Sequence, residues 1–153
     1  MKAPHLIVAA PDDWLAAQLR EWAAERKWLL RVVRQWPAFA AAAGGRRPCV
    51  AVLQADLSSD GWAAALAEVR RTHPDAAAVV VSDTKLNDDG KATLTAAAVD
   101  LGARFVLFPP LTRQALEDVV SGLAEAVLLR VRQAGSAAPE TAIALTEEDY
   151  EAP

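Results

Sequence analysis

The sequence predicts a single α/β domain in which five parallel strands alternate with five helices in a three-layer sandwich. Five short apolar runs rich in β-branched residues recur at intervals of about 20 to 29 residues, and helical patterns separate them. The runs are almost continuously apolar, which is typical of parallel strands covered by helices on both faces. The chain has 153 residues, 53% hydrophobic and 24% charged, as in an ordinary folded domain.

The predicted strands are residues 5–10, 28–33, 49–55, 77–82 and 104–108. Four of the intervening segments carry apolar residues three or four positions apart, the spacing of one helix face: Leu15, Leu19 and Trp22; Trp62, Leu66 and Val69; Leu94, Ala97, Ala98 and Leu101; and Leu116, Val119, Val120, Leu123 and Val127. The segment after the second strand, residues 35–45, predicts only a short alanine-rich helix that Gly44 and Gly45 end.

Residues that typically begin or end helices stand at the expected boundaries. They are Pro11 or Asp12 before the first helix, Asp60 and Gly61 before the third, Gly102 after the fourth and Thr112 before the fifth. The fifth helix is expected over about residues 112–132, and residues 133–142 are expected to be a linker.

Charge divides the chain into a domain at residues 1–133 and an acidic, flexible tail at residues 134–153. The domain holds 16 basic and 15 acidic residues and is nearly neutral, whereas the tail has no Lys or Arg and five acids: Glu140, Glu147, Glu148, Asp149 and Glu151. No segment has the excess of basic residues that nucleic-acid binding requires. The tail also contains Leu145 and Tyr150, so it resembles an acidic peptide that folds on a basic groove.

Other features exclude several classes of protein. No apolar run approaches the roughly 20 residues of a membrane helix, and no signal-peptide pattern is present, so a cytoplasmic location is expected. The single cysteine, Cys49, lies within an apolar strand and is expected to be a buried, inert thiol. Neither His5 nor His73 has a partner at catalytic or metal-binding spacing.

Four acids fall in loops at the carboxyl edge of the predicted sheet, where α/β proteins usually bind ligands: Asp12, Asp13, Asp56 and Asp60. One hypothesis is a displaced Mg²⁺ site. The alternative, which we favour, is that Asp12 and Asp60 cap helices, Asp13 lies in a positive first turn and Asp56 is a solvated loop acid. No metal and no cofactor are therefore expected.

Several segments together resemble the receiver domain of two-component response regulators, over about residues 4–132. The similar segments are "LIVAAPDDWLAAQL", "RPCVAVLQADLSSDGWAAALAEVRRTHP", "AAVVVSD" and "LGARFVLFPPLTRQALEDVV". The resemblance implies a flavodoxin-like (βα)5 fold with a parallel five-stranded sheet in the order 2-1-3-4-5.

The residues that carry receiver chemistry are replaced in this chain. The resemblance places Ala9 and Ala10 at the acidic pair that holds Mg²⁺, Gln54 at the phosphate-accepting aspartate and Pro109 at the lysine, and only Ser82 keeps its usual type. Methyl groups bind no metal, an amide is a poor nucleophile and proline carries no charge. Because the acidic positions and the lysine position are all replaced, the pocket is expected to be neutral and to hold no unpaired buried charge.

The sequence therefore predicts a non-catalytic pseudo-receiver that acts as a protein–protein interaction or regulatory module in signal transduction. The alternative is a small-ligand or nucleotide-binding domain that uses the neutral carboxyl-edge pocket. A third hypothesis, a receiver that accepts a phosphoryl group at Asp56, is less favoured because a solvated loop acid accounts for this residue. Separately, Ser82 could bind an anion or report pocket occupancy, but a strand-end serine that hydrogen-bonds nearby backbone groups is favoured.

The expected partner surface is the fourth helix, fifth strand and fifth helix, which the resemblance implies, used by a protein partner or in a homodimer. The fifth helix carries more apolar residues than one core-facing stripe needs, and the surplus is Leu128, Leu129 and Val131. In addition, the five tryptophans are not all expected to fit inside a domain of this size.

Overall fold

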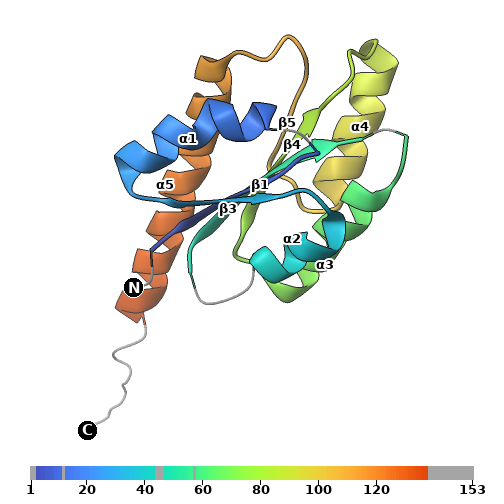
Figure 1. Ribbon diagram of the computed structural model, residues 1–153. Helices are drawn as coiled ribbons and strands as arrows, with labels where there is room; N and C mark the ends of the chain where they lie inside the picture. The colour runs from blue at the N-terminus through green and yellow to red at the C-terminus, as the bar shows by residue number, and fades with distance from the viewer. Residues whose placement is uncertain (1–2, 12, 44–46, 57, 138–153) are drawn as a thin grey trace, which may run out of the picture.

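The predicted sandwich and strand order are both confirmed by the computed structural model, which describes residues 3–11, 13–43, 47–56 and 58–137 (Figure 1). The strands are β1 (His5–Ala9), β2 (Leu29–Val33), β3 (Cys49–Ala55), β4 (Ala77–Ser82) and β5 (Phe105–Leu107). The helices are α1 (Trp14–Arg26), α2 (Trp36–Ala42), α3 (Gly61–Thr72), α4 (Asp88–Asp100) and α5 (Arg113–Ala137). All strand pairs are parallel, in the order β2-β1-β3-β4-β5.

The sheet divides the core into two layers because successive side chains of a strand point to opposite faces. In β1, Leu6 and Val8 pack in the layer that contains α1 and α5. Ile7 and Ala9 pack in the other layer, which contains α2, α3 and α4. Figure 1 shows α1 and α5 on one side of the sheet and α2, α3 and α4 on the other. Each fully buried Leu or Ile contributes about 1.5–3 kcal/mol to folding, so the side chains buried in each of the two layers stabilise the fold.

Trp22 fixes the position of α1 against α5. Its Nε1 donates a hydrogen bond to Ser121 Oγ at 2.9 Å, and its ring lies 5.7 Å from that of Trp28. Trp62 is also buried, whereas Trp36 is only partly buried and Trp14 is exposed. The expectation that the five tryptophans do not all fit inside the domain is therefore confirmed.

The helix boundaries agree less well with the sequence than the strands do. Thr112 Oγ1 accepts a hydrogen bond from the Ala115 N–H at 3.1 Å, as expected of a cap. The side chain of Asp60 makes no capping bond, so that prediction is wrong. With φ −109° and ψ 15°, its backbone is not in the extended form from which a capping side chain reaches back to the first turn. Asn87, which was not predicted, caps α4.

Helix α5 continues to Ala137, five residues beyond its expected end at residue 132, so the first part of the expected linker is helical. Gln and Ala favour a helix, and a single Gly costs only about 1 kcal/mol. Asp12, Gly44, Gly45 and the tail from residue 138 lie outside the described residues. Within those residues, no helix is both long and apolar enough to span a membrane.

Substitutions at two glycines test the backbone conformation, one just after α4 and the other within α5. Gly102 follows α4 with φ 109°, and a Cβ there would lie 2.9 Å from Arg70 Cδ, whereas a Cβ on Gly122 in α5 would meet nothing within 4 Å. We expect Gly102→Ala to lower the free energy of unfolding by about 1–3 kcal/mol. Gly122→Ala should raise it by about 0.5–1 kcal/mol, because alanine favours the helix.

Urea unfolding followed by tryptophan fluorescence measures both changes. Equal effects of the two substitutions would contradict the assignment of a left-handed backbone to Gly102.

Candidate functional site

The candidate site lies beyond the carboxyl ends of β1 and β3, where the strand order reverses and α/β domains usually bind ligands. The structure has a small cavity there, of about 70 Å³. Three of its lining residues, Ala9, Ala10 and Gln54, are positions that the resemblance assigns to receiver chemistry. Asp56 is one of the loop acids considered above, and four other residues complete the lining. The lining is Ala9, Ala10, Pro11, Val33, Arg34, Trp36, Gln54 and Asp56.

The part of the cavity formed by β1 is apolar. Ala9 and Ala10 are 1% and 3% exposed, and the Ala10 N–H donates to the Val33 carbonyl at 3.0 Å. The backbone is thus paired within the sheet and the side chains are methyl groups. Because Mg²⁺ needs several oxygen ligands in an octahedral arrangement, these two positions supply nothing that holds a metal ion.

Gln54 occupies the penultimate position of β3 and pairs in register with Val81 of β4. Its Oε1 is buried and has no hydrogen-bond partner among the residues that the structure describes. The amide is neutral and a weak nucleophile, so phosphoryl transfer to this side chain has no chemical basis. An unpaired buried oxygen instead costs stability.

Arg34 was not identified from the sequence, yet it lines the cavity. Its Nη1 donates to the Pro11 carbonyl at 3.1 Å, and its guanidinium forms an ion pair with Asp13. Asp13 stands immediately before α1 but makes no side-chain capping bond. The expectation of a neutral pocket is therefore wrong in detail: a cation is present, already paired with a carboxylate. Both side chains are half exposed, so the pair contributes at most about 1 kcal/mol.

Arg34 had a recognisable signal in the sequence, because it directly follows the last residue of β2. In the order 2-1-3, the residue after β2 is a neighbour of the residues after β1. That adjacency places Arg34 beside Pro11 and Ala10.

Asp56 lines the same cavity and is held in a turn by Ser58. Its Oδ1 accepts hydrogen bonds from the Ser58 N–H at 2.9 Å and from Ser58 Oγ at 2.7 Å. These bonds hold the pKa of the Asp56 carboxyl below its usual value, because they favour the ionised form. Within the described part of the chain, no three His, Cys, Asp or Glu side chains are grouped so that they could hold a metal.

The remaining aligned residues do not line the cavity. Ser82 is buried, and its Oγ donates to the Thr84 carbonyl at 2.7 Å and accepts from the Thr84 N–H at 3.2 Å. Its hydroxyl is thus bonded to local backbone. Pro109, beyond β5, precedes a cis peptide bond to Pro110 and supplies no charge.

The three surplus apolar residues of α5 have different surroundings. Leu128 is partly buried and packs against the layer of α1 and α5. Val131 lines a second, larger cavity at the opposite edge of the sheet. Leu129 is 49% exposed. They therefore do not form one continuous exposed surface, and an interface there stays a prediction.

Comparisons with known proteins identify the fold but no family at the level of sequence. No protein-family model matches the chain, and no curated protein matches it. Solved structures do match. The receiver domain of NtrX from Brucella abortus has a TM-score of 0.63 and 20% identity, over 78% of this chain and 98% of that one.

Two further structures agree. A CheY-like response regulator receiver domain protein from Methanospirillum hungatei has a TM-score of 0.66 and 9% identity, over 84% of this chain and 99% of that one. The beryllofluoride-activated NtrC4 receiver domain dimer has a TM-score of 0.64 and 16% identity, over 80% and 98%. The chain thus has the fold of response-regulator receiver domains, and identities this low show the fold alone.

Substitutions at Gln54 test the electrostatics of the cavity. Gln54→Asp should lower the free energy of unfolding by roughly 1–3 kcal/mol, because it places a carboxylate beside buried alanines without a metal ion or a free cation. Gln54→Met has a similar shape and removes the unpaired oxygen, so it should stay within about 1 kcal/mol of wild type.

Chemical denaturation at pH 7 measures both variants of Gln54. A Gln54→Asp variant more stable than wild type would show that Arg34 leaves Asp13 to pair with the new acid.

Proposed function

We propose that this chain is a pseudo-receiver: a non-catalytic protein-interaction or regulatory module of signal transduction that is not phosphorylated. The observation that carries the proposal is the composition of the carboxyl-edge cavity. In a receiver fold, this cavity presents the methyl groups of Ala9 and Ala10 and the amide of Gln54. These are the positions that the resemblance assigns to metal ligands and to the phosphate acceptor.

The charged groups near the cavity do not replace the lost chemistry. Phosphoryl transfer needs an acceptor and positive charge that offsets the charge on the transferring group. Arg34 is already paired with Asp13. The Asp56 carboxylate accepts hydrogen bonds from Ser58. The methyl groups of Ala9 and Ala10 add no metal ligand beside it. These contacts support the proposal that the cavity takes no part in phosphorylation.

The size of the cavity also argues against the ligand-binding alternative at this edge. Its volume is about 70 Å³, whereas sites for drug-sized ligands and cofactors usually have about 300–1,000 Å³. Arg34 and Trp36 are among its lining residues. We therefore do not retain a nucleotide or metabolite as the occupant of this pocket.

The proposed interaction surface is formed by α4, β5 and α5, with a protein partner or a second copy of the chain. Large apolar side chains are exposed on each of these elements: Val99 (51%) in α4, Phe105 (48%) in β5 and Leu129 (49%) in α5. Figure 1 shows that α4 lies beside β5, the edge strand. Exposed apolar surface favours association. The matching NtrC4 receiver structure is itself a dimer.

A phosphorylation assay tests the loss of receiver chemistry. Incubation with acetyl phosphate and Mg²⁺ should leave the intact mass and the melting temperature unchanged, because the acceptor and the metal ligands are absent. The control is a variant with Ala9→Asp, Ala10→Asp, Gln54→Asp and Pro109→Lys, which should gain one phosphoryl group. Stoichiometric, acid-labile phosphorylation of the wild-type chain at Asp56 would overturn the proposal.

Charge substitutions test the interaction surface. Val99→Glu with Phe105→Glu should convert an assembly to monomers, or reduce partner binding at least tenfold, because the two carboxylates would have to be desolvated in the interface. The matched control is Leu29→Glu, at the opposite edge of the sheet and 45% exposed in the wild type.

Light scattering during size-exclusion chromatography and pull-down from native lysate measure these effects. The proposal fails if the double variant assembles and captures partners as the wild type does, or if Leu29→Glu alone abolishes binding.

A further inference from the structure

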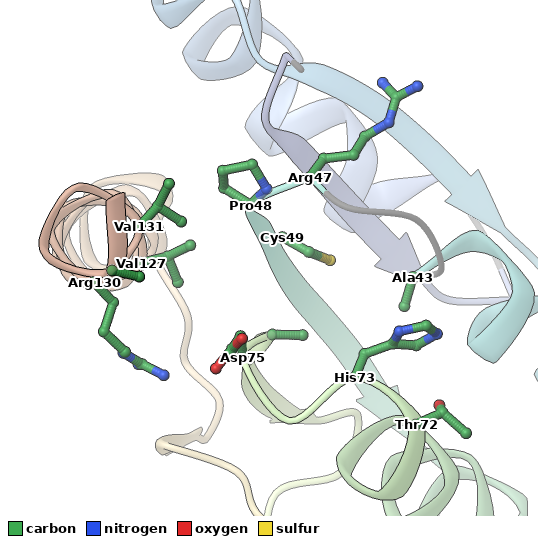
Figure 2. Close-up of a pocket in the computed structure, with 12 residues that line it drawn as sticks. Ala43, Arg47, Pro48, Cys49, Thr72, His73, Asp75, Val127, Arg130 and Val131 are labelled. Carbon is green, nitrogen blue, oxygen red and sulfur yellow. The ribbon is translucent and has the colours of Figure 1, made fainter. Parts of the chain in front are cut away.

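A second cavity, of about 500 Å³, lies at the amino edge of the sheet, at the opposite end from the carboxyl-edge pocket (Figure 2). It is bounded by the ends of α2 and α3, the start of β3 and the last turns of α5. Its lining is Ala43, Arg47, Pro48, Cys49, Thr72, His73, Asp75, Ala76, Val127, Arg130, Val131 and Ala134. This volume is in the range of sites that hold ligands or peptide side chains, roughly 300–1,000 Å³.

The cavity is apolar inside and polar at its rim. Cys49, Val127 and Val131 point toward its interior in Figure 2. Burial raises the pKa of the Cys49 thiol to about 12, so the thiol is neutral and contributes apolar surface. Around this interior stand Arg130 on one side and His73 on the other. Such a surface fits an apolar side chain flanked by polar or charged groups.

The charge at the rim is mainly positive. Arg47 and Arg130 line the cavity with one carboxylate, Asp75. Neither arginine forms an ion pair in the described residues, and in Figure 2 the Arg47 guanidinium points away from the cavity interior. Nearby His5 has a lowered pKa, first because of burial and then because of the positive charges of Arg47 and Arg31. The amino edge therefore favours an acidic ligand.

We propose that the acidic segment at residues 138–153 of this same chain docks in the amino-edge cavity, with the Tyr150 side chain in its apolar interior. Tyr150 follows Glu147, Glu148 and Asp149 and precedes Glu151. An aromatic ring between carboxylates matches an apolar cavity between arginines. The acids on either side of the ring meet Arg47 and Arg130, which form no ion pair within the described domain.

The connection between domain and segment makes this contact possible within one chain. Ala134 lines the cavity, and α5 ends three residues later at Ala137. Tyr150 lies thirteen positions beyond Ala137, and an extended chain of that length spans up to about 43–47 Å. The segment has ample length to turn back. A short tether gives an effective concentration in the millimolar range, so a weak contact is sufficient.

In this proposal the segment is an intramolecular ligand of the amino edge. An acidic partner peptide or a small anion would have to compete with it at Arg47 and Arg130. This inference does not depend on the proposed pseudo-receiver function, because the cavity shares no lining residue with the carboxyl-edge pocket.

Hydrogen exchange followed by mass spectrometry tests the contact on the full chain. Backbone amides of residues 147–151 should exchange at least tenfold more slowly than in the free peptide of residues 138–153. Arg47→Glu with Arg130→Glu should remove this protection. The matched control, Arg20→Glu with Lys85→Glu, makes the same change of net charge at exposed sites outside the cavity and should keep it.

Two further measurements separate docking in the cavity from unfolding of a variant and from docking on a second copy. Tyr150→Ser, which leaves every described residue unchanged, should also remove the protection, so the test stands even if far-UV circular dichroism shows that the arginine variant unfolds. The protection should be equal at about 2 and about 200 µM protein, because the effective concentration of a tethered segment, about millimolar, does not change with the protein concentration.

Three outcomes would overturn the inference. Free-peptide exchange rates in the wild type would mean that the cavity is open to an external ligand. Protection that rises with protein concentration would mean that the segment docks on a second copy. Protection that survives both Arg47→Glu with Arg130→Glu and Tyr150→Ser would mean that it docks elsewhere.

Discussion

The burial of both faces of β1, β3 and β4 is the constraint on which the rest of the structure depends. Parallel strands need a crossover between each pair, and here the crossovers are helices that cover both faces. All carboxyl ends of the strands then meet at one edge of the sheet, and the ends of the helices that precede them meet at the other. Both cavities lie at these edges, so the positions of both are consequences of the sheet.

Burial restricts which charged side chains the carboxyl edge of the sheet can hold. Ala9 and Ala10 are buried against the sheet, where an isolated carboxylate would be costly. The resemblance to receiver domains places Pro109 where that family has a lysine, and a proline side chain carries no charge. The charge that is present, on Arg34, lies near solvent and is paired with Asp13. The cavity is therefore lined mainly by uncharged side chains, and Arg34 and Asp56 are the charged residues of its lining.

The two edges of the sheet differ in the volume of their cavities and in whether their arginines are paired with carboxylates. The carboxyl-edge cavity is small and its cation is paired, whereas the amino-edge cavity is several times larger and has two arginines at its rim that form no ion pair in the described residues. In this chain, the edge that the fold class usually employs is the poorer binding site. The two proposed interactions, through α4, β5 and α5 and at the amino edge, therefore use surfaces other than the carboxyl edge.

The sequence by itself determined the fold class, the bounds of β3 and β4, and the methyl groups of Ala9 and Ala10 at the end of β1, because strand pattern and residue chemistry are local properties. Tertiary structure decided the rest. Arg34 reaches Pro11 and Asp13 only because β2 lies beside β1. The amino-edge cavity exists only where the ends of α2, α3 and α5 meet β3. Leu128, Leu129 and Val131 point to three different surroundings because helical rotation relative to neighbouring elements, which no local pattern specifies, sets what each side chain contacts.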